Sequence, residues 1–211
     1  ALYRMRFGEG GLISISRRHR HAHPCQAEPP VPNTPIVSAL VTPRLDPLTS
    51  VEPHVAAYLA ALRVAGFAGE ICTDYATRLL AATDNSIYQQ LPAAVVFART
   101  SADVQHALRL LDEPHFHKVA LTARGGGTGT NGQALTPGVV LDVSRHMREI
   151  LELNLEEGFV RVQPGVVLDD LNAFLKQHQV YFAPNLSPSN RATMGGMIST
   201  DASGEGSRLH G

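Results

Sequence analysis

The chain has 211 residues, of which 44% are hydrophobic and 18% are charged, and its formal net charge is −1. This composition is typical of a soluble globular protein and lacks the basic excess that nucleic-acid binding requires. No apolar run approaches the roughly 20 residues of a membrane span, and the N-terminus has no signal-peptide core. The two cysteines, Cys25 and Cys72, form no disulfide framework or metal-ligand spacing. We therefore expect a cytoplasmic protein with no nucleic-acid partner and no transmembrane segment.

Residues 1–50 differ in composition from the rest of the chain. They are rich in arginine, histidine, proline and glycine and show little periodicity, so we expect a poorly ordered extension. Residues 18–25 hold three histidines and a cysteine, as a metal site could, but no carboxylate accompanies them. The sequence therefore predicts no metal site, and a leader or an upstream start also fits this segment.

From residue 51 to residue 90 the pattern becomes helical. Val55, Leu59 and Leu62 recur on one helical face, and a second apolar face begins at Tyr75. Glycines interrupt the pattern between the two faces. The sequence predicts a helical hairpin over residues 51–90.

The following segment has the pattern of a β-α-β unit. A right-handed unit of this kind places the loop after its second strand at the C-terminal edge of the sheet, where ligands usually bind. The expected strands cover residues 94–97 and 118–121, with a helix between them that Ser101 opens as N-cap. Later elements are a strand over 139–142, a strand hairpin over 149–155 and 159–163, and a helix over 168–175.

The most informative stretch is residues 122–132, which hold five glycines. Glycine permits positive φ and exposes successive N–H groups, so the stretch predicts a nest for an anion, and a nucleotide pyrophosphate is the expected guest. Residues 127–132 formally match the Rossmann glycine pattern, but a turn and a strand follow them in place of a helix. No Lys-Ser or Lys-Thr pair follows, which excludes a Walker-type loop. A glycine-rich surface turn without a ligand remains the alternative.

A second glycine cluster occupies residues 184–204. Gly195 and Gly196 permit close approach of a ligand to the backbone. Hydroxyl groups for further hydrogen bonds come from Thr193, Ser199, Thr200 and Ser203. Two nests imply an extended ligand, and the alternative is an ordinary loop followed by a helix of small residues.

Together these pieces resemble the FAD-binding domain of the p-cresol methylhydroxylase (PCMH) and vanillyl-alcohol oxidase superfamily, from about Leu91 to the C-terminus. The motifs that carry the resemblance are Arg-Gly-Gly-Gly-Thr at 124–128, Val-x-Pro-Gly-Val at 162–166, Pro184 with Ser187, and Thr-x-Gly-Gly at 193–196. Residues 76–92, with Thr-Asp-Asn-Ser-Ile-Tyr at 83–88, look like the large bacterial D-2-hydroxyglutarate dehydrogenases. Those flavoproteins are similar to D-lactate dehydrogenases and add an iron–sulfur domain further along.

The resemblance implies an α+β fold, namely the first lobe of a PCMH-type FAD-binding domain. That lobe is a small mixed sheet with flanking helices, preceded here by the helical hairpin and truncated at its C-terminus. The expected domains are the extension over 1–50, the hairpin over 51–90 and an incomplete FAD-binding domain over 91–211. Thr128 stands where some relatives carry a histidine that attaches the flavin, so the resemblance implies noncovalent FAD.

Two sets of residues are implied to bind the cofactor. The set around the pyrophosphate is Arg124, Gly125, Gly126, Gly127, Thr128, Gly129, Thr130, Asn131 and Gly132. The set along the flavin and its ribityl chain is Pro184, Ser187, Thr193, Gly195, Gly196, Ser199, Thr200, Gly204, His210 and Gly211. His210 replaces the tyrosine often found at its position in the family.

No catalytic residue is assigned from the sequence. Ser203 lacks the Gly-x-Ser-x-Gly elbow of serine hydrolases. His146 follows Arg145 in a predicted turn, and we expect a surface position for it rather than one at the cofactor edge. The resemblance implies that a missing C-terminal part supplies the catalytic base, the substrate-carboxylate site and any iron–sulfur cluster.

The expected function is that of an N-terminal FAD-binding fragment of a dehydrogenase or oxidase. The whole protein would oxidise a small D-2-hydroxy acid, D-2-hydroxyglutarate or D-lactate, by hydride transfer to flavin, and the fragment alone would be inactive. Two alternatives stay open. One is a nucleotide-binding module without redox activity, and the other is a truncated product that self-associates through an exposed sheet edge.

Overall fold

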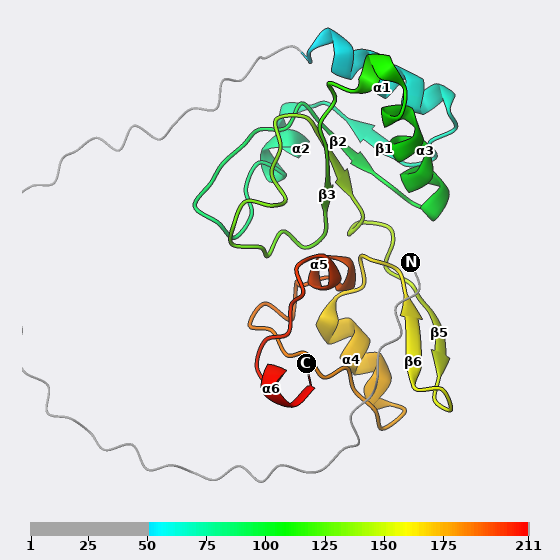
Figure 1. Cartoon of the computed structure of the whole chain (residues 1–211), viewed down its shortest axis with the longest axis vertical. Helices are drawn as coiled ribbons and strands as arrows, with labels where there is room; N and C mark the ends of the chain where they lie inside the picture. Colours follow the sequence, from blue (N-terminus) through cyan, green and yellow to red (C-terminus); the bar gives the residue numbers. More distant parts are fainter. Residues whose placement is uncertain (1–50, 211) are drawn as a thin grey trace, which may run out of the picture.

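The computed structural model describes residues 51–210 and shows two lobes joined by one crossing of the chain (Figure 1). The first lobe is built around a four-stranded sheet, and the second around a two-stranded sheet and three helices. The α+β fold expected from the sequence is confirmed. The segment 1–50, with its histidine cluster, and Gly211 lie outside the described residues. No helix among residues 51–210 is long and apolar enough to span a membrane.

The sheet of the first lobe is mixed, with strand order β1-β2-β4-β3. Its strands are β1 Glu70–Cys72, β2 Ala94–Phe97, β3 Leu121–Arg124 and β4 Val139–Asp142. β2 and β3 both pair parallel with β4, whereas β1 pairs antiparallel with β2. Parallel pairing brings the C-terminal ends of β2, β3 and β4 to one edge. The glycine-rich loop therefore leaves from that edge.

Helices cover both faces of this sheet. α1 Pro53–Val64 and α3 Ser101–Leu111 lie on the face that carries Val96, and α2 Tyr75–Leu80 lies on the face that carries Val95. The hydroxyl of Tyr58 on α1 donates to the carbonyl of Ala107 on α3 at 2.8 Å, and burial raises the pKa of Tyr58 to about 12. Coverage on both faces explains why β2 and β4 are almost wholly apolar.

The segment 51–90 is not a simple helical hairpin. Both expected helices are present, but β1 lies between them and joins the sheet, and α1 packs against α3 and the 3-10 turn η1 Pro114–Phe116. β1 has three residues of intermediate burial, which is too short a run for a period-two pattern to appear in the sequence.

The strand before the glycine loop lies three residues later than the sequence predicts. Val119 is buried, but its N–H closes the turn onto the carbonyl of Phe116, and β3 then runs from Leu121 to Arg124. The strand thus includes Arg124, which the sequence analysis places in the loop. β4 also inserts between β2 and β3, so the two strands of the predicted β-α-β unit are not neighbours.

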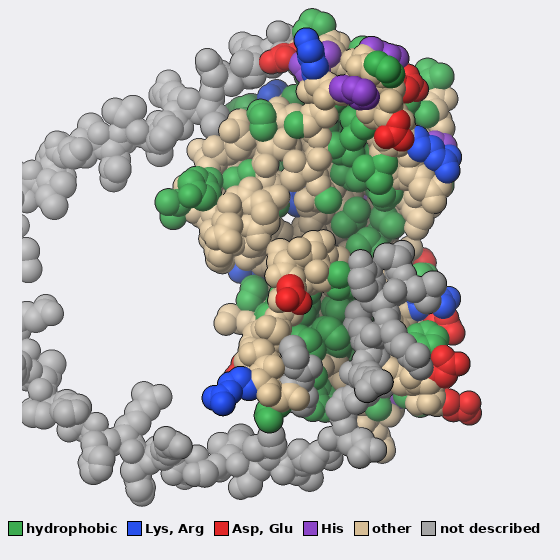
Figure 2. All heavy atoms as spheres, in the orientation of Figure 1, with side chains coloured by type: hydrophobic (Ala, Val, Ile, Leu, Met, Phe, Trp, Pro, Cys, Tyr) green, Lys and Arg blue, Asp and Glu red, His purple; other side chains and the backbone are tan. Residues whose placement is uncertain are grey.

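The second lobe contains the predicted strand hairpin and helix. Its elements are β5 Ile150–Asn154, β6 Phe159–Val162, α4 Leu168–Lys176, α5 Met194–Ser199 and α6 Ser207–His210. Leu168, Leu171 and Leu175 form one fully buried face of α4 and pack with Val160 and Met194. This core is separate from that of the first lobe. On the face drawn in Figure 2, the histidine side chains gather at the outer end of the first lobe, together with several charged side chains.

A buried carboxylate fixes the start of α3. Thr100, rather than Ser101, is the N-cap, and its side chain and that of Asp103 form a capping box. Asp103 is 1% exposed and accepts the N–H groups of Ala68 at 2.7 Å, Arg99 at 2.9 Å and Thr100 at 3.0 Å. Burial alone raises the pKa of Asp103, but the N–H donors outweigh it and hold the pKa below its usual value.

We predict that Asp103→Ala lowers the free energy of unfolding by about 2 to 4 kcal/mol, because three backbone donors lose a charged acceptor. Asp103→Asn should cost less. Because the folded-state pKa is lowered, the charge contributes its full stability above the ordinary carboxyl pKa and loses it as pH falls through the lowered value. Urea unfolding at pH 7 and at acidic pH should therefore show the wild-type advantage over Asp103→Asn shrinking with acid.

Asp112 at the other end of α3 is the matched control, because it is exposed and lies at the C-cap. Asp112→Ala should change the unfolding free energy by less than about 0.5 kcal/mol. Equal losses for Asp103→Ala and Asp112→Ala would contradict the proposed role of the buried carboxylate.

Candidate nucleotide site

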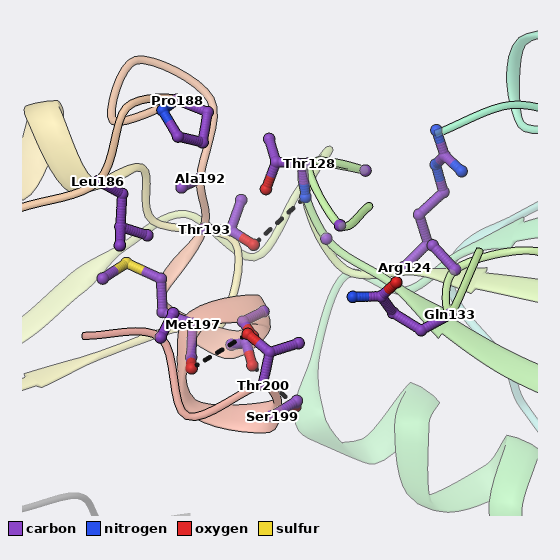
Figure 3. A pocket seen from close by; sticks show the side chains of 18 of the residues that line it. Arg124, Thr128, Gln133, Leu186, Pro188, Ala192, Thr193, Met197, Ser199 and Thr200 are labelled. Carbon is purple, nitrogen blue, oxygen red and sulfur yellow. Dashed lines mark hydrogen bonds between the residues drawn. The ribbon is translucent and has the colours of Figure 1, made fainter. Parts of the chain in front are cut away.

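A cavity of about 1190 Å³ lies between the two lobes. The glycine loop at the end of β3 forms one wall, and α5 with the segment that precedes it forms the other. Figure 3 shows Thr128 and Gln133 on the side of the first lobe, and Leu186, Thr193 and Met197 on the side of the second. The two glycine clusters of the sequence therefore face each other across one space.

The glycine loop exposes unpaired backbone donors. Gly127 has φ of +62°, which turns the chain in the region that favours glycine. Within residues 51–210, no hydrogen bond uses the N–H of Gly127, Thr128 or Gly129 as a donor. Successive free N–H groups give a concave patch of positive partial charge, which is the chemistry of an anion nest.

The loop meets the opposite wall too closely for side chains. The N–H of Gly126 donates to the Thr193 hydroxyl at 3.3 Å (Figure 3). A Cβ on Gly125 would collide with that hydroxyl, and a Cβ on Gly126 would collide with the carbonyl of Arg191. The first two glycines thus bring the lobes together, and the following residues present their donors to the cavity.

The second wall has fewer free hydroxyls than the sequence suggests. The Ser199 and Thr200 hydroxyls donate to the carbonyls of Gly195 and Gly196, both at 2.9 Å. Their oxygens can still accept hydrogen bonds from a ligand. The backbone nitrogen of Gly196 lies close to Gly125, because a Cβ on Gly125 would lie 3.8 Å from it.

The structure brings most of the predicted cofactor-binding residues to this one cavity, although their contact with a cofactor stays a prediction. Those that line it are Arg124, Gly125, Gly126, Gly127, Thr128, Gly129, Asn131, Ser187, Thr193, Gly195, Gly196, Ser199, Thr200 and Gly204. Thr130, Gly132 and Pro184 do not line it. Gly132 turns instead toward Tyr88, whose ring would lie 3.0 Å from a Cβ at that position. The His210 side chain and Gly211 are outside the description.

Arg124 has a structural task that the sequence analysis does not foresee. Its guanidinium donates to the carbonyls of Ala81 at 3.3 Å and Thr83 at 2.7 Å, and in Figure 3 it extends away from Thr193. Burial lowers the pKa of Arg124, while the charges of Asp142 and Asp84 act in the opposite direction. Arg124 therefore ties the end of β3 to the segment after α2.

Sequence reasoning also missed part of the cavity wall. Gln133 accepts the N–H of Asn131 at 3.0 Å and covers Gly129, where a Cβ would collide with its amide. The other missed residues are mostly apolar or small, and include Val143, Pro164, Leu186, Pro188, Ala192 and Met197. Pro164 stands in the Val-x-Pro-Gly-Val motif, which is the one signal that points to it.

Comparison with known proteins identifies the family. A family model described as an FAD binding domain matches residues 92–211. The chain belongs to this family. The cavity between the glycine loop and α5 thus lies within the FAD-binding domain.

A curated relative of this FAD-binding domain is the D-2-hydroxyglutarate dehydrogenase of Pseudomonas putida, which is 62% identical over 154 residues. The match covers 73% of this chain but only 15% of that relative. The chain therefore spans about a seventh of the length of the enzyme it matches.

Solved structures show the fold of the FAD-binding domain. Alkyldihydroxyacetonephosphate synthase superposes with a TM-score of 0.64 at 21% identity, over 79% of this chain and 32% of that one. p-Cresol methylhydroxylase superposes with a TM-score of 0.53 at 17% identity, over 69% of this chain and 29% of that one. The fold that the resemblance implies for residues 91–211 is therefore confirmed, and the family match confirms the FAD-binding domain.

We predict that Arg124→Lys lowers the free energy of unfolding by about 1 to 3 kcal/mol, because an ammonium cannot span two carbonyls as a guanidinium does. Hydrogen exchange should also become faster in residues 81–90, which Arg124 holds. Arg109→Lys is the control, because Arg109 is exposed on α3 and its side chain forms no hydrogen bond or ion pair within residues 51–210. Unchanged exchange in residues 81–90 would show that Arg124 does not anchor them.

Proposed function

We propose that this chain holds the pyrophosphate of FAD in the glycine loop, and that the protein it represents oxidises a D-2-hydroxy acid. The main support for this proposal is the run of unpaired N–H groups from Gly127 to Gly129 at the edge of a large cavity. A pyrophosphate offers acceptor oxygens and negative charge, so it satisfies donors that no residue of the described chain satisfies.

The residues present fit FAD in size and chemistry. The cavity of about 1190 Å³ is long enough to extend from the glycine loop to α5, and its wall changes from backbone donors to apolar side chains. Leu186, Ala192 and Met197 supply the apolar part, which suits an aromatic ring system. The loop would hold the phosphates, and the α5 side would hold the ribityl chain and one face of the flavin.

We propose noncovalent attachment of the flavin. Some relatives attach the flavin covalently through a histidine in the first glycine loop, and the described residues that line the cavity include no histidine. Thr128 occupies the comparable position in the loop. Its hydroxyl can hydrogen-bond to a phosphate but cannot form the histidyl bond.

D-2-hydroxyglutarate is the substrate we propose for the whole protein, with D-lactate as the alternative 2-hydroxy acid. Support comes from the 62% identity with a relative named D-2-hydroxyglutarate dehydrogenase. When bound, FAD would supply the acceptor for a hydride from the carbinol carbon of the 2-hydroxy acid. The residues described here bind, orient and shield the cofactor, and we propose that its electrons leave through an iron–sulfur centre or another acceptor outside this segment.

We place the catalytic base outside residues 51–210 as well. Arg124 and Glu205 are the only ionisable side chains among the described residues that line the cavity. Arg124 is engaged with two carbonyls, and Glu205 is exposed, with its carboxylate 3.5 Å from the Asn185 amide. An arginine stays protonated and cannot act as a base near neutral pH, and the exposed Glu205 lacks the buried environment that tunes a carboxylate for proton transfer.

The first test is a titration of the purified chain with FAD, followed by quenching of flavin fluorescence. Gly127→Asp should weaken binding by about ten-fold or more, which corresponds to about 1.4 kcal/mol. The change forces a side chain into the positive-φ region, places it 2.6 Å from the Arg124 guanidinium and puts a negative charge in the nest.

Gly66→Asp is the matched control for this titration. Gly66 also has positive φ, at +90°, but it lies after α1 with no atom within 4 Å of its Cβ position. It therefore carries a similar backbone strain without touching the cavity. Equal FAD affinities for wild type and Gly127→Asp, or no binding by the folded wild-type chain, would refute the proposed site.

A second measurement concerns turnover. The chain loaded with FAD should show no oxidation of D-2-hydroxyglutarate or D-lactate with an artificial electron acceptor, because the described wall offers no tuned base. The rate should match that of free FAD at the same concentration. If the loaded chain turns over faster than free FAD, and Glu205→Gln removes this activity, the base lies within this chain. That result would overturn the proposal that the base lies outside residues 51–210.

A further inference from the structure

The single chain crossing between the lobes is held along most of its length. Residues 143–149 run from β4 to β5. The N–H of Val143 donates to the carbonyl of Arg124 at 3.0 Å, which fastens the crossing to the residue before the glycine loop. Asp142 accepts the N–H groups of Ser144 at 2.8 Å and Arg145 at 3.1 Å, and Met147 is buried in the core of the first lobe. We call residues 143–149 the interlobe linker.

The carboxylate of Glu70 on β1 contacts this linker and forms an ion cluster with it. Its oxygens lie 2.7 Å from His146 Nε2 and 3.1 Å from Arg145 Nη1, and Arg99 Nη2 lies 3.6 Å away. Arg145 also stacks over the ring of Phe97, with its guanidinium carbon 4.6 Å from the ring centre. Three donors from two other segments thus converge on a single acceptor. His146, for which the sequence predicts a surface turn rather than the cofactor edge, belongs to this cluster.

None of these four polar residues lines the cavity, so the cluster has no contact with a ligand there. The hydrogen bond from His146 holds the pKa of Glu70 below its usual value, burial acts against it, and Arg145, the charge of His146 and Arg99 add to the lowering. Glu70 is therefore ionised at neutral pH and serves as the common counter-charge.

A continuous path leads from the linker to the far wall of the cavity. The carbonyl of Met147 accepts the N–H of Gly165 at 2.8 Å, and a Cβ on Gly165 would lie 2.7 Å from that carbonyl oxygen. The carbonyl of Pro164, the residue that precedes Gly165, accepts the N–H of Gly195 at 2.8 Å. Gly195 belongs to α5, which forms the second wall. Displacement of the linker is thus passed to α5 through two hydrogen bonds and a close backbone contact.

We propose that Glu70 is a positioning residue that locks the interlobe linker and thereby sets the distance between the glycine loop and α5. The proposal rests on the proposed function only for the identity of the ligand. Removal of the charge leaves Arg99, Arg145 and His146 without their shared negative charge, and the two arginines then repel each other without compensation. The linker loses its lateral support, and the second lobe samples a wider range of positions.

The test is the distance between two spin labels, one on each lobe, measured by pulsed electron paramagnetic resonance without FAD. Arg109→Cys on α3 and Lys176→Cys on α4 carry the labels, both at exposed positions, in a chain with Cys25→Ser and Cys72→Ser. Glu70→Gln keeps the shape of the side chain and removes its charge. The distance distribution should broaden in this variant, and the FAD dissociation constant should rise by about five-fold.

Glu152→Gln is the matched control, because Glu152 forms a similar ion pair with Arg161, at 2.8 Å, within the β5–β6 hairpin. It should change neither the label distances nor FAD binding. Glu70→Asp keeps the charge and should lie closer to wild type than Glu70→Gln in both measurements. A purely stabilising role for Glu70 would lower the unfolding midpoint without broadening the distances in the folded chain.

An unchanged distance distribution in Glu70→Gln overturns the proposal, and so does a broadened distribution with unchanged FAD affinity. If Glu70→Gln does not fold, Arg145→Gln, at a half-exposed position, tests the same ion cluster from the linker side. Broadened distances in a chain that binds no FAD in any variant would support the positioning role of Glu70 and refute the proposed function. The two failures are therefore distinguishable.

Discussion

The absence of a Cβ at Gly125, Gly126 and Gly165 is the constraint on which the arrangement of the two lobes depends. The first two glycines meet the Thr193 hydroxyl and the Arg191 carbonyl, and Gly165 meets the carbonyls of the interlobe linker. Side chains at these positions would push the lobes apart. Because each lobe has its own apolar core, packing within the lobes does not fix the width of the cavity. Close backbone contacts and the Glu70 cluster fix it instead.

Sheet topology explains why those contacts lie beside the anion nest. The parallel strands β3 and β4 end at the same edge, so the glycine loop and the linker begin next to each other. The hydrogen bond from the Val143 N–H to the Arg124 carbonyl joins the first residue of the linker to the last residue of β3. A ligand in the cavity at this edge of the sheet would therefore contact both the glycine loop and Val143 of the interlobe linker. This follows the general rule that open sheets of this kind bind ligands at the C-terminal ends of their strands.

The sequence predicts the parts of the site that depend on backbone chemistry. A run of glycines exposes backbone N–H groups whatever the tertiary contacts. The sequence also predicts a strand rather than a Rossmann helix after residues 122–132, and β4 confirms this. Roles that depend on tertiary partners could not be read in the same way. The structural role of Arg124 could not be predicted, because its carbonyl partners lie 41 and 43 residues away in the sequence. β1 was too short to show a period, and the Glu70 cluster joins residues 76 positions apart.

The unpaired donors of the loop have an energetic meaning for the whole molecule. The Gly126 N–H to Thr193 hydroxyl hydrogen bond, at 3.3 Å, joins the glycine loop directly to the opposite wall of the cavity. A ligand that spans the cavity contacts both walls and adds its binding free energy to the arrangement in which they face each other. At a ligand concentration a hundred times the dissociation constant, this linkage amounts to about 2.7 kcal/mol. That is comparable to the net contribution of two or three hydrogen bonds, so a ligand bound across the cavity would stabilise the relative position of the two lobes.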